Sequence, residues 1–216
     1  MSAIELIIFD CDGVLVDSEP IANRVFAREL QAQGLAITVE EVTRTFIGRS
    51  RDTCIEMAGR MRGAALPEDF AATWDAALHA ALELEVQPVD GVPEVLRALR
   101  IPYCVASNGE RGHMRIALTA AGLMPLVAGR LFSAAQVARP KPAPDLFLHA
   151  AKSMGAEAGA CVVVEDTVTG VKAAAAAGMR VFGYAGGAHT DADALAAHGA
   201  EVFRHMRSLP SLLEEP

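Results

Sequence analysis

The chain has 216 residues, 52% of them hydrophobic, with a net charge of −8 and a pI near 5.2. That length and hydrophobic content allow one large domain with a buried core, or one domain with an insertion. The acidic balance argues against binding to nucleic acid or a membrane surface, because both attract basic patches. An anionic substrate would need a local positive site.

Neither a membrane span nor a secretion signal is apparent in the sequence. No apolar run reaches the roughly 20 residues that a span needs, and the start, MSAIE, lacks the basic residues of a signal peptide. The four cysteines lie far apart and form no CxxC pair that could hold zinc. We therefore expect reduced cysteines in a cytoplasmic protein. Cys11 could be reactive, although a buried spacer is the better interpretation.

The first predicted element is a strand at residues 4–9, and two acids follow it. Five of its six residues are apolar, which is typical of a buried strand in a parallel sheet. Asp10 and Asp12 come next, and Gly13 allows a sharp turn and a close approach of the backbone to a ligand. Ligands bind beyond the carboxyl ends of such strands, so both acids would stand at the mouth of a site. Read alone, the pair could also be a solvated turn.

A long helical block follows this strand. Ser18 and Pro20 can start a helix that ends at Gly34, and no convincing strand lies between Glu19 and Val86. A purely helical block after one strand predicts an inserted helical cap domain at residues 19–87, with a core formed by residues 1–18 and 88–216. Residues 88–93 are rich in turn formers and would be the return hinge. The other helices predicted in this block are residues 39–46, 51–61 and 70–84, divided by Gly48 and by residues 63–67.

Strands and helices alternate in the rest of the chain. Alternation predicts βαβ units, and hence an α/β fold with a Rossmann-like parallel sheet and helices on both of its faces. The predicted strands are residues 103–106, 131–132, 161–164, 180–184 and 201–203. The predicted helices are residues 92–99, 113–121, 145–154, 168–177, 191–197 and 209–214.

Polar residues stand at the ends of several of these strands. In a right-handed parallel sheet the strand ends meet at one edge, so these groups would share a cavity. Carboxylate oxygens suit Mg²⁺, while a lysine and small donors suit the oxygens of a phosphoryl group. The groups are Asp10 and Asp12, then Ser107 and Asn108, then Glu165 and Asp166, with Lys141 between two prolines in the preceding loop.

Each of these groups also has an ordinary interpretation when taken alone. Ser107 and Asn108 could form a simple turn, Lys141 could be a solvated charge, and Glu165 with Asp166 could cap the next helix. If these ordinary interpretations were all correct, the polar groups would occur at successive strand ends by chance. The shared site is the better interpretation.

Four segments, in this order, resemble the motifs of the haloacid dehalogenase-like hydrolases. They are FDCDGVLVDSE at residues 9–19, VASNG at 105–109, KPAPD at 141–145 and VEDT at 164–167. The helical insert is similar to the small cap of the branch that holds phosphoglycolate phosphatase and β-phosphoglucomutase. The resemblance covers essentially the whole chain.

The resemblance implies a role for each position. Asp10 would attack phosphorus and carry an aspartyl-phosphate. Asp12 would protonate the leaving group and then activate water, which calls for a raised pKa. A cis peptide is expected before Pro142. Mg²⁺ would be held by Asp10, the backbone carbonyl of Asp12, Asp166 and, in an assisting role, Glu165, while Gly13, Ser107, Asn108 and Lys141 would bind the phosphoryl group.

Departures from the family pattern narrow the reaction. Dehalogenases lack the acid at Asp12, and phosphonate-cleaving relatives need a cap lysine, which this chain does not have. Mutase relatives use a histidine, a lysine and an arginine of the cap. In this chain Ala22 stands at the position of the histidine, the cap has no lysine, and only Arg51 looks similar to the arginine. A phosphatase of small phosphorylated metabolites is therefore expected, with a β-phosphoglucomutase-like mutase as the alternative. A non-catalytic binder is the third hypothesis, although it would have no use for both acids.

Substrate choice is expected to lie in the cap. Asn23, Arg49 and Arg51 are the candidates for contacting the substrate, unless these arginines are merely solvated. A basic cap mouth would favour a second acidic group, as in a phosphorylated sugar acid, and the whole pattern is similar to the 6-phosphogluconate phosphatase type. No long amphipathic interface is evident, so a monomer is expected.

Overall fold

The computed structural model describes residues 4–46, 49–188 and 190–214. Its centre is a six-stranded sheet in the order β3-β2-β1-β4-β5-β6, and every neighbouring pair is parallel. The predicted α/β fold with an inserted helical region is therefore confirmed. The strands are β1 (Leu6–Phe9), β2 (Tyr103–Ser107), β3 (Leu131–Ser133), β4 (Cys161–Glu165), β5 (Arg180–Tyr184) and β6 (Glu201–Phe203).

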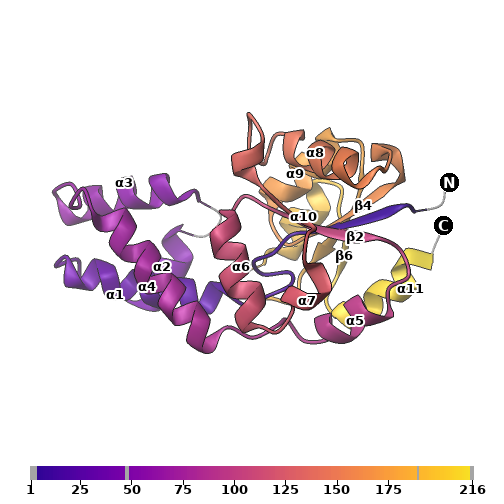
Figure 1. Ribbon diagram of the computed structural model, residues 1–216. Helices are drawn as coiled ribbons and strands as arrows, with labels where there is room; N and C mark the ends of the chain where they lie inside the picture. Colours follow the sequence, from indigo (N-terminus) through magenta and orange to yellow (C-terminus); the bar gives the residue numbers. More distant parts are fainter. Residues whose placement is uncertain (1–3, 47–48, 189, 215–216) are drawn as a thin grey trace.

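Helices cover both faces of the sheet (Figure 1). One face packs against α8 (Asp145–Met154), α9 (Val168–Ala176) and α10 (Ala192–Ala197). The other packs against α5 (Val92–Ala98), α6 (Arg111–Ala120), α7 (Met124–Val127) and α11 (Leu209–Glu214). Short 3₁₀ helices complete this part of the fold, and within the described ranges they lie at Ala134–Gln136, Ala158–Ala160 and Met206–Ser208.

Strand β1 is buried on both faces because it lies at the centre of the sheet. Leu6 and Ile8 point to the face of α8 and α9, whereas Ile7 and Phe9 point to the face of α5 and α6. This alternation follows from the two-residue period of a strand. A strand with two buried faces reads as a continuous apolar run, which is the pattern seen in the sequence.

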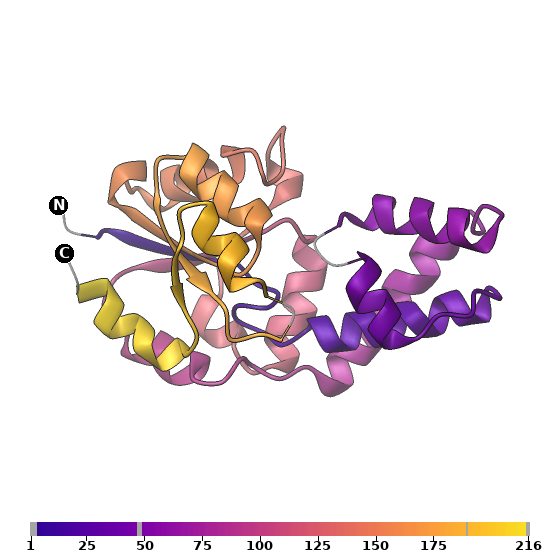
Figure 2. The same cartoon turned by 180° about the vertical axis from the view of Figure 1, so that it is seen from behind.

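The first four of the described helices after β1 form the cap, which lies to one side of the sheet with α6 beside it (Figures 1 and 2). The cap has its own core, in which the ring of Phe26 stacks on that of Trp74 with centroids 4.1 Å apart. Phe46 and Phe70 close the same cluster. The cap helices are α1 (Glu19–Ala32), α2 (Val39–Phe46), α3 (Arg51–Arg62) and α4 (Phe70–Glu85).

The two chain segments that join cap and core run side by side. The backbone amide of Asp17 donates to the carbonyl of Gln87 at 3.0 Å, and that of Val89 donates to Leu15 at 3.0 Å. Val16 and Pro88 form an isolated antiparallel bridge between them. The predicted return hinge is thus one of two paired linkers. The division of the chain at residues 18/19 and 87/88 stays a prediction.

The structure differs from the predicted elements in a few places. Helix α7 was not expected, because four residues carry no helical period. Strands β2 and β4 extend by one residue, so that Ser107 and Glu165 belong to the strands. Helix α10 begins after Asp191, whose side chain accepts from the amide of Ala194 as an N-cap. The expected divider Gly48 lies outside the described residues. Within the described ranges, no helix is long and apolar enough to span a membrane.

All four cysteines are buried and free. Burial raises the pKa of Cys11 well above its usual range, that of Cys54 and Cys161 to about 11, and that of Cys104 to about 12. Cys11 is fully buried, as expected for a spacer between the two acids. Because the thiolate is the reactive form, we expect Ellman's reagent at pH 8 to modify less than one thiol in the folded protein and all four in denaturant. A fast-reacting thiol that disappears in Cys11→Ala would contradict this.

Candidate active site

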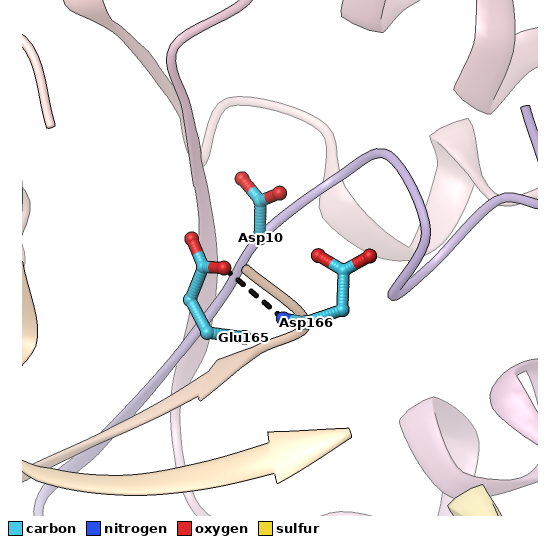
Figure 3. Close-up of side chains that lie close together, drawn as sticks. All are labelled: Asp10, Glu165 and Asp166. Carbon is cyan, nitrogen blue, oxygen red and sulfur yellow. Dashed lines mark hydrogen bonds between the residues drawn. The ribbon is translucent and has the colours of Figure 1, made fainter. Parts of the chain in front are cut away.

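The acidic residues at the ends of β1 and β4 meet at one edge of the sheet (Figure 3). Asp10, Glu165 and Asp166 are buried, and one carboxylate oxygen from each lies within 4.8 Å of the others. The adjacent parallel strands β1 and β4 deliver these side chains at the same level, as predicted from their positions after the strands. Three buried carboxylates this close repel one another unless positive charge is present.

Lys141 supplies part of that charge. Its ammonium group donates three hydrogen bonds, to Asp10 Oδ1 at 2.8 Å, Glu165 Oε1 at 2.7 Å and the carbonyl of Ala106 at 2.8 Å. The side chain is only 3% exposed and its Nζ lies 4.6 Å from the ring centroid of Phe147. Three donors with three acceptors fully satisfy the ammonium, which is what a buried charge requires. The peptide between Lys141 and Pro142 is cis, as expected.

Glu165 anchors this arrangement. Its Oε2 accepts from the backbone amides of Asp166 and Thr167 and from the Thr167 hydroxyl, while Oε1 accepts from Lys141. Gly170, in the first turn of α9, leaves the space for this carboxylate, because a Cβ there would lie 1.8 Å from Glu165 Oε1. Because both Glu165 oxygens are engaged by protein donors, this residue positions Lys141. The helix α9 is capped by Thr167 rather than by the acids.

Ser107 and Asn108 hold the neighbouring loops. The amide group of Asn108 donates to the carbonyl of Lys141 at 3.1 Å and accepts from its backbone amide at 2.9 Å. The hydroxyl of Ser107 accepts from the amide of Gly109 at 3.0 Å. The structure thus brings both residues to the predicted site. The Asn108 side chain therefore fixes the backbone of Lys141.

Asp12 lies in the turn after β1, near Gly13, whose φ is +77°. Ser18 donates to Asp12 Oδ1 at 2.7 Å, and His113 Nε2 lies 3.3 Å from the same oxygen. Burial acts to raise the pKa of Asp12, but the hydrogen bond and charge of His113, together with the bond from Ser18, outweigh it and lower the pKa. The expected raised pKa of Asp12 is therefore wrong, because these donors favour the carboxylate.

The raised pKa belongs to Asp10. Burial raises it well above the usual value, Lys141 acts in the opposite direction, and Glu165 and Asp166 add to the rise. The different surroundings of Asp10 and Asp12 therefore shift the pKa values of these two acids in opposite directions. These directions are the reverse of what attack by Asp10 and proton donation by Asp12 require. The positive charge of a bound cation would lower the pKa of Asp10, and a phosphoryl group beside Asp12 would raise the pKa of Asp12.

The three cap candidates lie in different surroundings. Asn23 lines a cavity of about 620 Å³ at the hinge, together with Gly13 and Thr43. Arg49 is exposed and donates to the backbone carbonyl of Thr45 at 3.0 Å, while Arg51 pairs with Asp75 of α4. Arg51 is thus tied to another cap helix.

The carboxylates fit a divalent cation by their chemistry. Hard oxygen ligands on a buried, rigid edge suit such an ion, and its charge would offset the repulsion among Asp10, Glu165 and Asp166. Since both carboxylate oxygens of Glu165 accept hydrogen bonds from protein donors, Asp10 and Asp166 are the residues that would bind the ion directly.

Three residues of this site were not predicted from the sequence. Ser18 was assigned only as a helix start and Gly170 only as part of an alanine-rich helix. His113 was assigned as the first residue of a helix, and no sequence signal connects it with Asp12, 101 residues away.

The chain combines an α/β fold with an inserted helical cap, and it places a lysine among carboxylates at the strand ends. These features together are typical of hydrolases that have a cap domain. Residues 4–178 match the haloacid dehalogenase-like hydrolase family. The chain belongs to this family.

Individual relatives agree with this assignment. The chain is 32% identical to 6-phosphogluconate phosphatase of Escherichia coli over 213 residues, which cover 98% of this chain and 96% of that protein. A haloacid dehalogenase-like protein of unknown function from Agrobacterium tumefaciens has 39% identity and a TM-score of 0.87, with 98% of both chains covered. A hydrolase of the same family from Deinococcus radiodurans, solved with phosphate and sodium, has 33% identity and a TM-score of 0.82, covering 99% of this chain and 98% of its own.

Proposed function

We propose that this chain is a Mg²⁺-dependent phosphatase that hydrolyses small phosphorylated metabolites through an aspartyl-phosphate on Asp10. The observation that carries the proposal is the pairing of Asp10 with Lys141 inside an acidic cluster, with Asp12 only two residues further on. A nucleophile beside a fixed cation and a proton-transferring acid suits phosphoryl transfer. The phosphate in the structure of the Deinococcus relative supports the same class of ligand.

In the first step a carboxylate oxygen of Asp10 would attack phosphorus, and the bond from phosphorus to the leaving oxygen would break with its electron pair on that oxygen. Lys141 faces the attacking carboxylate and would stabilise the added negative charge. Asp12 would give its proton to the leaving oxygen. A phosphate dianion beside Asp12 would raise the pKa of that carboxyl by like-charge repulsion, which would offset the lowering by His113 and Ser18.

In the second step water would attack phosphorus and release the Asp10 carboxylate. Asp12, now ionised, would take the proton of that water, and microscopic reversibility gives it both roles. Ser107 and the backbone near Asn108 would bind phosphoryl oxygens. A Mg²⁺ ion held by Asp10, the Asp12 carbonyl and Asp166 would neutralise phosphate charge.

For the substrate we propose sugar or sugar-acid phosphates, with 6-phosphogluconate as the first to test. The likeness to 6-phosphogluconate phosphatase over nearly the full length of both chains supports this choice. A mutase has less support, because all three lysines of the chain lie outside the cap, at Lys141, Lys152 and Lys172. A mutase would convert β-glucose 1-phosphate to glucose 6-phosphate when primed with a bisphosphate.

Metal removal tests the proposal directly. We expect phosphate release from p-nitrophenyl phosphate and from a panel of sugar phosphates to vanish in EDTA and to return when excess Mg²⁺ is added. The fold should persist, because the core and cap clusters do not involve the site. Circular dichroism in EDTA is the control. Activity that survives EDTA, or a panel without any phosphate release, would overturn the proposal.

A further inference from the structure

Asp12 Oδ1 is contacted by two side chains that come from different elements of the chain. Ser18 precedes α1 at the start of the cap, and its hydroxyl donates to Asp12 Oδ1 at 2.7 Å. His113 comes from α6 of the core, with Nε2 at 3.3 Å from the same oxygen. The His113 side chain is 18% exposed and that of Asp12 is 24% exposed, so water competes little for this contact. Asp12 ends up at the meeting point of cap and core.

His113 also touches the cap. The ring centroids of His113 and His79, a residue of α4, are 5.5 Å apart with the ring planes inclined at 45°. Asp75, one turn earlier on α4, is close enough to act on the charge of His113 and is paired with Arg51 of α3. One imidazole therefore contacts a cap helix on one side and the Asp12 carboxylate on the other.

We propose that His113 is a positioning residue that directs the Asp12 carboxyl toward the leaving group, and that its packing against His79 makes this direction depend on the cap. The inference rests on the proposed phosphatase function. In either protonation state of the ring, Nε2 can carry hydrogen and donate to the carboxylate. With only Ser18 left, the carboxylate keeps one donor and can rotate away.

Loss of the His113 contact should affect one step, the transfer of the Asp12 proton to the leaving oxygen. As the P–O bond breaks, its electron pair goes to the leaving oxygen, which takes the Asp12 proton, while Asp10 forms the new bond to phosphorus. A basic leaving group such as phenolate needs that proton far more than p-nitrophenolate does. Loss of the position of Asp12 should therefore harm phenyl phosphate more than p-nitrophenyl phosphate.

The test compares kcat/KM for both esters, in Mg²⁺ at one pH, for wild type and three variants of the full chain. His113→Phe retains a ring against His79 but lacks the donor, and His113→Gln restores a donor. We expect His113→Phe to lower kcat/KM about 10- to 100-fold for phenyl phosphate and at least about threefold less for p-nitrophenyl phosphate. His113→Gln should recover most of both losses. Should His113→Phe fail to fold, as judged by circular dichroism, His113→Leu takes its place.

The third variant, His79→Leu, tests the link to the cap. It leaves the Asp12–His113 contact in place, so we expect a smaller loss, about threefold, again larger for phenyl phosphate. Equal losses on both esters in His113→Phe, or no loss, would overturn the positioning role, and an unchanged His79→Leu would overturn the link to the cap. A wild type that hydrolyses neither ester contradicts the proposed function itself, which separates the two failures.

Discussion

Asp10→Asn should abolish phosphate release, with a loss of about 10⁴-fold or more, because an amide cannot form the covalent intermediate. Malachite green detection with p-nitrophenyl phosphate and with the best sugar phosphate of the panel measures the loss. Retained activity would mean that another group attacks phosphorus. The variant changes few atoms in the site, and Lys141 keeps its bonds to Glu165 and Ala106.

The same substitution should stabilise the metal-free protein. Burial, opposed by Lys141, raises the pKa of Asp10, which means that folding disfavours its carboxylate. In EDTA at pH 7 we therefore expect Asp10→Asn to raise the unfolding temperature; about 1 kcal/mol would give about 2–4 °C in a chain of this size. The advantage should shrink as the pH falls and wild-type Asp10 takes up its proton.

Asp12→Asn is the matched control, because its effect on stability should have the opposite sign. The pKa of Asp12 is lowered by His113 and Ser18 against the effect of burial, so folding favours its carboxylate. That contribution is present above the unfolded pKa of about 3.9 and is lost as the pH falls through the lower folded value. At pH 7 in EDTA, Asp12→Asn should therefore unfold at a lower temperature than wild type. Equal shifts in both variants would contradict the assignment of opposite surroundings to the two acids.

The order of elements could be predicted because it depends on local pattern. The apolar run before Asp10 and the helical periods of the cap are properties of neighbouring residues, and most of the predicted bounds differ from the structure by one or two residues. The meeting of Asp10, Lys141 and Asp166 followed from a general rule on the ends of parallel strands. Both results needed only sequence order and the period of each element.

Side-chain contacts between distant elements were not predictable in this way. His113 reaches Asp12 only because α6 packs beside the turn after β1, and no local pattern encodes that distance. Arg51 is a candidate for contacting the substrate, and its ion pair with Asp75 on another helix of the cap was not predicted. The pKa of Asp12 was misjudged for the same reason: the crowding of acids is visible in the sequence, but the two donors that oppose it are not.

Gly170→Ala should disrupt the active site, because Gly170 packs directly against the Glu165 carboxylate. A Cβ at this position would lie 1.8 Å from Oε1 and 1.9 Å from Cδ of Glu165, so Gly170→Ala must displace that carboxylate. Lys141 would lose one of its three acceptors, and the amides of Asp166 and Thr167 would lose theirs. We expect a loss of about 100-fold in kcat and of about 3 kcal/mol in the free energy of unfolding, measured by urea denaturation. Gly112→Ala in α6 is the control, since its Cβ would meet nothing within 4 Å.

A double-mutant cycle decides whether Gly170 acts through Glu165 alone. In Glu165→Ala the carboxylate that the new Cβ would strike is gone, so adding Gly170→Ala should cost nothing further and should bring the small gain of alanine over glycine within a helix, about 0.5–1 kcal/mol. The two losses are then far from additive, as expected for groups in direct contact. If the double variant instead loses the sum of both, Gly170 serves the packing of α9 on the sheet independently of Glu165. Non-additivity would show that Gly170, by leaving space for the Glu165 carboxylate, helps to hold Lys141 beside Asp10.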